Sequence, residues 1–146
     1  MNERILETAD RLFYQRGIRA VGMNYRSCSG EMNRTARLYH AGETDDVAVA
    51  HDWLDQRFPG VPKGMIGVSL GGNVLLKYLG ERREELGIRL RAAVAISPPF
   101  DLAMGSDSVH ESSARRYLPG FLRSLKAKVR ARESLLSGRI DVARTL

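Results

Sequence analysis

A Gly-x-Ser-x-Gly motif at positions 67–71 constrains the fold of this chain more than any other feature. It separates a short apolar run, Gly64–Val68, from a segment whose apolar residues recur at helical spacing, Leu70–Glu85. A serine between a strand and a helix in this pattern occupies a turn so tight that side chains two residues to either side would collide, which accounts for the two glycines. The motif therefore predicts a sharp bend that projects the Ser69 hydroxyl above the end of a buried strand.

The same turn suits nucleophilic chemistry. It aims the next backbone N–H, that of Leu70, at the space beside the serine, where it would serve as an oxyanion-hole donor with the positive end of the helix. A packing turn or a phosphate loop is the alternative, but the phosphate-loop and dinucleotide fingerprints are both absent. We expect Ser69 as a catalytic nucleophile and Gly67 and Gly71 as elbow glycines, with no metal or cofactor.

The rest of the chain up to about residue 100 alternates between helical and strand-like patterns. The expected elements are a helix at 3–15, a strand at 18–25, a loop at 26–42, a helix from Thr44 to before Pro59, the strand and helix around Ser69, and a strand at 90–97. The inward side chains are expected to be Val47, Ala50, Trp53, Leu54, Val74, Leu75, Tyr78 and Leu79. The last strand is apolar throughout, as in strands covered on both faces. This order predicts a three-stranded parallel α/β sheet.

The final quarter of the chain has a different character. Residues 105–113 are polar and predict a linker, and Leu118, Leu122, Leu125 and Val129 then form one stripe of an amphipathic helix. Residues 111–146 hold 9 basic and 3 acidic side chains, which accounts for the whole net charge of +6. No exposed aromatic pattern or reading motif accompanies that charge, so nucleic-acid binding is not expected. We divide the chain into a core at 1–104 and a linker with a basic helix at 105–146.

Composition narrows the class of protein further. Hydrophobic residues make up 43% of the chain, which is typical of a soluble globular protein. Cys28 is the single cysteine, so an intrachain disulfide and a cysteine-based zinc site are excluded, and a reducing, cytoplasmic location is expected. The first ten residues carry charged side chains and no apolar run, so we expect neither a signal peptide nor a transmembrane segment.

Four collinear stretches resemble a known family. They are NYRSCSGEMNR at 24–34, YHAGETDD at 39–46, GVSLGGN at 67–73 and SPPFDL at 97–102. Together they resemble the YheT-like branch of the α/β-hydrolases, family 4. The resemblance implies an eight-stranded, mostly parallel sheet and carboxylesterase activity on short or lipid-like acyl esters. It also implies that Ser69 is the nucleophile, that Leu70 donates an oxyanion N–H, and that the C-terminal helix is part of a cap.

The chain also departs from the family pattern. Ser27 and Met32 stand where the family usually has Gly and Pro. The family's His-Gly oxyanion loop precedes the first helix seen here, and its catalytic Asp and His follow later strands, so we expect all three to be lacking. The resemblance places another strand between the first two strands predicted here. A gap there would leave backbone groups unpaired, at about 1–3 kcal/mol each. We therefore expect a marginally stable, aggregation-prone chain, or one completed by another polypeptide.

Three histidines are available as a catalytic base. His51 is expected on the surface of a helix, and His40 is expected to fix its loop by hydrogen bonding. A substitute triad of Ser69, His110 and Asp101 is conceivable, but Asp101 is more simply a cap or turn residue. Two functions remain open: a serine hydrolase of acyl esters that lacks its triad Asp and His, or a non-catalytic remnant that acts as an interaction module.

Overall fold

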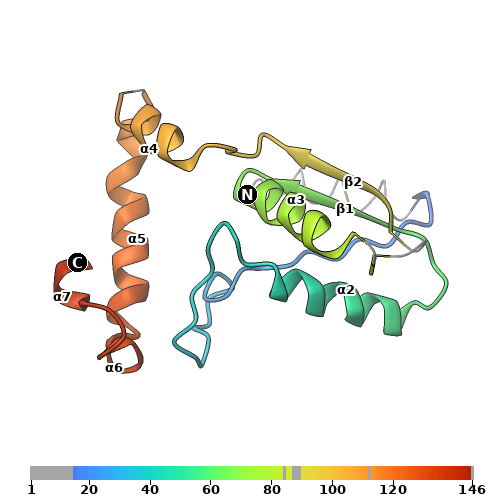
Figure 1. Cartoon of the computed structure of the whole chain (residues 1–146), viewed down its shortest axis with the longest axis horizontal. Helices are drawn as coiled ribbons and strands as arrows, with labels where there is room; N and C mark the ends of the chain where they lie inside the picture. The colour runs from blue at the N-terminus through green and yellow to red at the C-terminus, as the bar shows by residue number, and fades with distance from the viewer. Residues whose placement is uncertain (1–14, 84, 87–89, 112, 146) are drawn as a thin grey trace.

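The computed structural model describes residues 15–83, 85–86, 90–111 and 113–145. The helix predicted at 3–15 lies almost wholly outside these residues. The described core is a small parallel α/β unit in which β1 (Lys63–Val68) and β2 (Leu90–Ile96) pair and α3 (Leu70–Arg82) lies between them in the chain (Figure 1). Val68 lies opposite Ile96 at the carboxyl ends of the two strands. The predicted order of strand, helix and strand around Ser69 is therefore confirmed.

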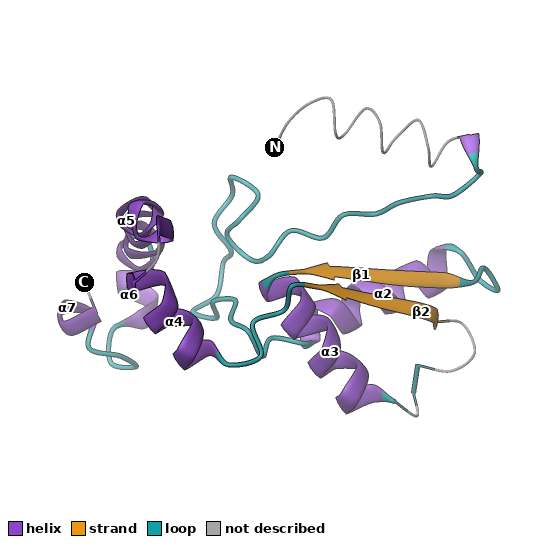
Figure 2. Cartoon of the chain, turned by 90° about the horizontal axis from the view of Figure 1, so that it is seen from above, coloured by secondary structure: helices purple, strands orange, loops and turns teal. Residues whose placement is uncertain are grey.

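The prediction of three strands was wrong for the described residues, which form a two-stranded sheet. Residues 18–25 run extended on the β1 side of the sheet in both views, but they form no strand (Figures 1 and 2). A strand requires a neighbour about 4.7–4.9 Å away to pair its backbone groups. The segment at 18–25 therefore does not pair with β1. This is one of the two outcomes expected for a sheet that lacks the strand between them.

The core is centred on α3. Val74, Leu75 and Tyr78 are buried as predicted. On α2 (Asp45–Arg57) the buried residues are Ala48 and His51. The prediction that Trp53 points inward was wrong: its side chain is exposed and contacts the Phe58 ring edge-to-face. The physical reason is that α2 packs against α3 through a hydrogen bond of 2.9 Å between His51 Nδ1 and the Tyr78 hydroxyl.

Within the described parts of the chain, one face of the sheet carries exposed apolar side chains. Ile66 and Val68 of β1 lie opposite Val94 and Ile96 of β2, and all four side chains are exposed. Ile66 is 70% exposed. The opposite face packs against α3, where Gly67 and Ala95 lie close to Gly72. The prediction that the last strand, now β2, is covered on both faces was therefore wrong, because in the described residues α2 packs on α3 and not on the second face of the sheet.

The C-terminal part is a set of helices beside the sheet (Figure 1). They are α4 (Leu102–Glu111), the 3-10 helix η2 (Ser113–Tyr117), α5 (Leu118–Arg130), α6 (Glu133–Leu136) and α7 (Val142–Thr145). The linker predicted at 105–113 is instead mostly helical, since α4 extends to residue 111. The amphipathic helix predicted from Leu118 is confirmed as α5.

Lys128 connects α5 to the loop before α2. Lys128 Nζ donates a hydrogen bond of 3.1 Å to Cys28 Sγ and lies 5.1 Å from the centroid of the Tyr39 ring. Hydrogen bonding to Cys28 and the nearby Tyr39 raise the pKa of Lys128, so its ammonium stays charged at neutral pH. None of the described helices combines the length and apolar character needed to cross a bilayer.

Candidate functional site

Ser69 forms the bend between β1 and α3. Its backbone has φ 51° and ψ −121°, a conformation that L-residues rarely adopt and that costs about 1–3 kcal/mol. The Ser69 N–H donates to the Ile96 carbonyl at 2.8 Å, which extends the β1–β2 pairing by one residue. The Ser69 carbonyl accepts the Gly72 N–H at 2.8 Å and so begins α3. The residue is exposed, and its hydroxyl makes no capping hydrogen bond to the helix.

Backbone strain is concentrated at one edge of the sheet. Among the described residues other than glycine, Ser27, Ser69 and Ser97 have positive φ, at 61°, 51° and 48°. Each follows an extended segment: residues 18–25, β1 and β2 respectively. Such conformations persist where the surrounding structure enforces them, and they cluster at functional sites. The edge at the carboxyl ends of the strands is therefore the best candidate site, and Ser69 is its central residue.

The glycines beside Ser69 have different roles from those predicted. A Cβ on Gly67 would lie 2.3 Å from the Gly71 carbonyl oxygen, so only glycine fits there, as expected. A Cβ on Gly71 would lie 3.6 Å from the Tyr25 hydroxyl, an ordinary contact, so the collision expected at Gly71 does not occur. The second tight glycine is Gly72, whose added Cβ would approach Pro98 Cβ to 3.0 Å. Gly72 directly follows Gly71, and this second glycine was the sequence feature that could have predicted its tight packing.

The N-terminus of α3 points its free N–H groups toward the same edge. Leu70 is the first residue of α3, and the first N–H groups of a helix have no acceptor within it. A partial positive charge also accumulates at this end of the helix. The first turn of α3 has no acidic side chain that would cancel this charge. The geometry therefore favours an anion or a developing oxyanion beside Ser69.

Tyr25 is a neighbour of this bend that sequence reasoning did not select. Its ring stacks on Tyr39 with centroids 5.1 Å apart, and its hydroxyl approaches Gly71. Burial, together with Tyr39 and Cys28, raises the pKa of Tyr25. The phenol therefore stays protonated at neutral pH and can donate a hydrogen bond. Its position at the end of the predicted first strand was the signal that could have identified it.

None of the three histidines pairs with Ser69. His40 is exposed, and its Nδ1 accepts the Gly42 N–H at 3.1 Å, which is the loop-fixing role expected of it. His51 was predicted to be a surface residue, and this was wrong: it is buried between α2 and α3 against Tyr78. His110 lies near the end of α4 and is exposed, so it does not lie in a linker.

The substitute triad is not formed. Asp101 Oδ1 accepts the Met104 N–H at 2.9 Å, so this carboxylate caps α4. His110 is nine residues further along the chain, and a helix of that length separates the two by about 13 Å. Asp101 is therefore a capping residue, and it cannot orient His110.

An ion pair between a buried carboxylate and a half-exposed arginine fixes the loop that carries His40. Glu43 is 2% exposed, and its carboxylate accepts hydrogen bonds from Arg37 at 2.6 and 2.8 Å. Arg37 also reaches Asp45 at 2.6 Å, and that hydrogen bond holds the pKa of Asp45 below its usual value. Arg26 forms an ion pair with Asp46, which like Asp45 lies in the first turn of α2. These contacts hold the loop against the start of α2.

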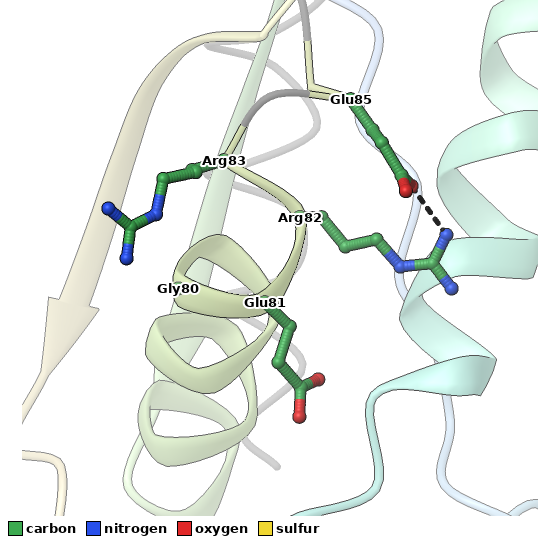
Figure 3. A pocket seen from close by; sticks show the side chains of 5 residues that line it. All are labelled: Gly80, Glu81, Arg82, Arg83 and Glu85. Atoms are coloured by element: carbon green, nitrogen blue, oxygen red, sulfur yellow. Dashed lines mark hydrogen bonds and ion pairs between the residues drawn. The ribbon is translucent and has the colours of Figure 1, made fainter.

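Two other candidate features lie apart from Ser69. Figure 3 shows a pocket at the C-terminal end of α3, lined by Gly80, Glu81, Arg82, Arg83 and Glu85, with a 2.7 Å ion pair between Arg82 and Glu85. Ser69 lies at the other end of this 13-residue helix, about 20 Å away. Among the described residues, no group of three or more His, Cys, Asp or Glu side chains could hold a metal ion.

A strand, a strained serine bend and a helix with a free N-terminus form the strand–turn–helix geometry that the Gly-x-Ser-x-Gly motif requires. YheT of Escherichia coli (strain K12), which carries the name of an esterase, is 36% identical over 128 residues, 88% of this chain and 37% of YheT. Monoacylglycerol lipase of Saccharomyces cerevisiae is 31% identical over 120 residues, 81% of this chain and 26% of the lipase. The chain belongs to the α/β-hydrolase superfamily.

The comparisons also include shorter matches. Phospholipase ABHD3 of Mus musculus is 38% identical over 65 residues, 44% of this chain and 16% of the phospholipase. The chain therefore spans about a third of the length of the curated relatives it matches first, at 37% and 26%. No family model matches the chain, and no solved structure matches it significantly.

Proposed function

We propose that this chain is the nucleophile-bearing part of a serine hydrolase that cleaves acyl esters, with Ser69 as the nucleophile. The observation that carries the proposal is the Ser69 backbone at φ 51° and ψ −121°, which exposes a hydroxyl that does not cap α3. In the reaction the Ser69 oxygen attacks the ester carbonyl, and the Leu70 N–H stabilises the oxyanion that forms. Relatives named for acting on monoacylglycerols and phospholipids support carboxylic esters with lipid-like acyl chains as the substrate class.

The catalytic base is proposed to come from outside the residues described here. A serine hydroxyl needs a base to accept its proton, and each histidine of this chain is placed elsewhere. His40 holds its loop, His51 is buried with Tyr78, and His110 is on α4. We therefore expect the Asp and His of the triad to be supplied by other residues, in a longer protein or in a complementing polypeptide. A strand from the same source would fit beside β1. A reducing, cytoplasmic compartment remains the proposed location.

A fluorophosphonate probe tests the nucleophile directly. With imidazole added to replace the missing base, we expect mass spectrometry to find the label on Ser69 in the wild-type chain and no label at this position in Ser69→Ala. Ser97 is the matched control, because it is exposed, has φ 48° and follows β2 at the same edge. Ser97→Ala should label at Ser69 as the wild type does. Equal labelling of both serines, or none at Ser69, would contradict the proposal and favour a non-catalytic interaction module.

Chemical rescue tests the missing base. The chain alone should hydrolyse p-nitrophenyl acetate no faster than Ser69→Ala does. Added imidazole should produce an increment in rate that is present in the wild type and absent in Ser69→Ala, once the background reaction is subtracted. Turnover by the wild type without imidazole, absent in Ser69→Ala, would show instead that the chain holds its own base.

A further inference from the structure

The helices η2 and α5 form a strongly basic segment, which we call the basic arm (Ser113–Arg130). It contains no acidic side chain. Its basic residues are Arg115, Arg116, Arg123, Lys126, Lys128 and Arg130. Among them, Arg123 and Arg130 are exposed and lie on one side of α5, since seven residues are close to two helical turns. The arm therefore carries a positive field that nothing within it neutralises.

The basic arm also exposes large apolar side chains. Tyr117, Phe121 and Leu122 are 72%, 58% and 40% exposed. Tyr117 and Phe121 are four residues apart and therefore lie side by side on consecutive turns. Leu118, Leu125 and Val129 are only half-buried, although Leu136 of α6 and Val142 of α7 are buried near this helix. The aromatic pair is thus left outside the small core that the C-terminal helices form.

We infer that the basic arm binds the surface of a bilayer that contains anionic phospholipids. Phenylalanine, tyrosine and leucine side chains insert at the boundary between headgroups and acyl chains, and lysine and arginine side chains attract anionic headgroups. By helical geometry Arg123 and Arg130 lie on the side of α5 away from Phe121. A helix is only about 10–12 Å across, and the Debye length in physiological salt is about 8 Å. Anionic headgroups in contact with Phe121 are therefore still attracted by these two arginine side chains.

The charge of the arm argues against the other occupants. A second copy of this chain would bring two arms of the same sign together, which is repulsive. The expectation that no exposed aromatic side chains accompany the charge was wrong, since Tyr117 and Phe121 are exposed and offer stacking surfaces to bases as well. A nucleic acid would still leave the exposed Leu122 side chain in water. A membrane surface uses both the basic and the apolar side chains, and it is where acyl lipids are found. The inference goes beyond the proposed function and does not require Ser69 to be catalytic.

Vesicle sedimentation with the full chain tests the inference. We expect binding to phosphatidylcholine vesicles to increase about tenfold or more when phosphatidylserine is included, and to fall as salt is raised. The double variant Tyr117→Ser/Phe121→Ser should bind several-fold more weakly than the wild type to both kinds of vesicle. The matched control is Ile66→Ser, which removes an equally exposed apolar side chain from the open sheet face and should leave binding unchanged.

A second pair of variants separates the charge contribution. Arg123→Gln/Arg130→Gln should lower binding to phosphatidylserine vesicles about tenfold and should flatten the salt dependence. Arg57→Gln/Arg83→Gln, at two exposed positions outside the arm, should change little. The inference is overturned if anionic vesicles are not bound, if Ile66→Ser weakens binding as much as the aromatic variant, or if size-exclusion chromatography shows a dimer that the aromatic variant dissociates. Because Ser69→Ala should bind vesicles normally, failure of this inference is distinct from failure of the hydrolase proposal.

Discussion

The elbow depends on a few atoms around Ser69. The Gly67 Cα lies so close to the backbone of Gly71 and Gly72 that a methyl group has no space. This contact holds the first turn of α3 against the end of β1 and forces the Ser69 φ to a positive value. Close packing of the Gly67 backbone against the backbone of Gly71 and Gly72 thus maintains the strain at Ser69. Adding a single methyl group at Gly67 tests this packing.

Gly67→Ala should destabilise the chain by about 1–3 kcal/mol or more, because the new Cβ would lie 2.3 Å from a backbone oxygen. Urea unfolding followed by circular dichroism measures this change. Gly71→Ala is the matched control. Its new Cβ has ordinary contacts within a helix, so stability should be unchanged or higher by about 0.5–1 kcal/mol. Equal losses in the two variants would contradict the steric assignment.

In the part of the chain that the structure describes, the two-stranded sheet has an exposed apolar face. Ile66, Val68, Val94 and Ile96 form an apolar strip in the register of the parallel pair. Exposed apolar surface on a short sheet with an unpaired edge promotes association. We therefore expect the aggregation predicted from the sequence to start on this face, away from α3.

Ile66→Thr/Val94→Thr should reduce aggregation severalfold, because both side chains are exposed and threonine retains high strand propensity. Light scattering at increasing protein concentration would measure it, and the unfolding temperature should change little. Val74→Thr, at a buried position of α3, is the control. It should cost about 1–3 kcal/mol and should increase aggregation. Unchanged scattering in the double variant would show that another surface is responsible.

A hydrogen bond to a charged carboxylate also joins the start of α2 to α3. Thr44 Oγ1 donates to Glu81 Oε2 at 2.7 Å, and Lys77 pairs with the same carboxylate. These contacts lower the pKa of Glu81 from its usual value of 4.5, with the Lys77 hydrogen bond as the largest cause. A lowered folded-state pKa gives stability that is present above the unfolded pKa and is lost as the pH falls through the folded value.

The unfolding temperature should therefore fall as the pH drops below about 4.5. In Glu81→Gln the unfolding temperature should fall less steeply with decreasing pH, because the ionised carboxylate that protonation would neutralise is already absent. The variant should therefore differ least from the wild type at low pH. Glu31→Gln, whose carboxylate is 3.7 Å from Arg34 and highly exposed, is the control and should retain the wild-type slope. Differential scanning fluorimetry from pH 3 to 7 is a suitable measurement.

At the scale of the whole molecule, the C-terminal helices are attached to the core by few contacts. Lys128 bridges α5 to Cys28 and to the Tyr39 ring, which in turn stacks on Tyr25 beside the elbow. This line of contacts runs from the basic arm to the edge that carries Ser69. We therefore expect Lys128 to contribute to the position of the arm relative to the bend at Ser69.

Lys128→Ala should increase hydrogen exchange severalfold in α5 and in the loop at 26–42, because both lose the contact that joins them. Exchange in α3 should not change. Arg130→Ala removes an exposed cation from the same helix and is the control. Similar exchange in Lys128→Ala and the wild type would show that other contacts hold the arm in place.

Sequence reasoning predicted the local structure well where one residue type was required by geometry. The glycine-flanked serine, the helix after it and the capping role of Asp101 all depend on neighbours a few residues away, so they could be recognised from spacing alone. The amphipathic helix α5 followed from its apolar period in the same way. Local sterics and backbone hydrogen bonding explain these successes.

Only the tertiary structure decided which faces are covered. The strand predicted at 18–25 stays unpaired because no neighbour reaches it, and the apolar pattern of β2 does not reveal that one face is open. His51 is buried because Tyr78, 27 residues away, offers a hydroxyl at 2.9 Å. Pairing and burial depend on segments distant in the chain. The amino-acid sequence by itself thus determined the bend at Ser69, while contacts between distant segments determined what surrounds it.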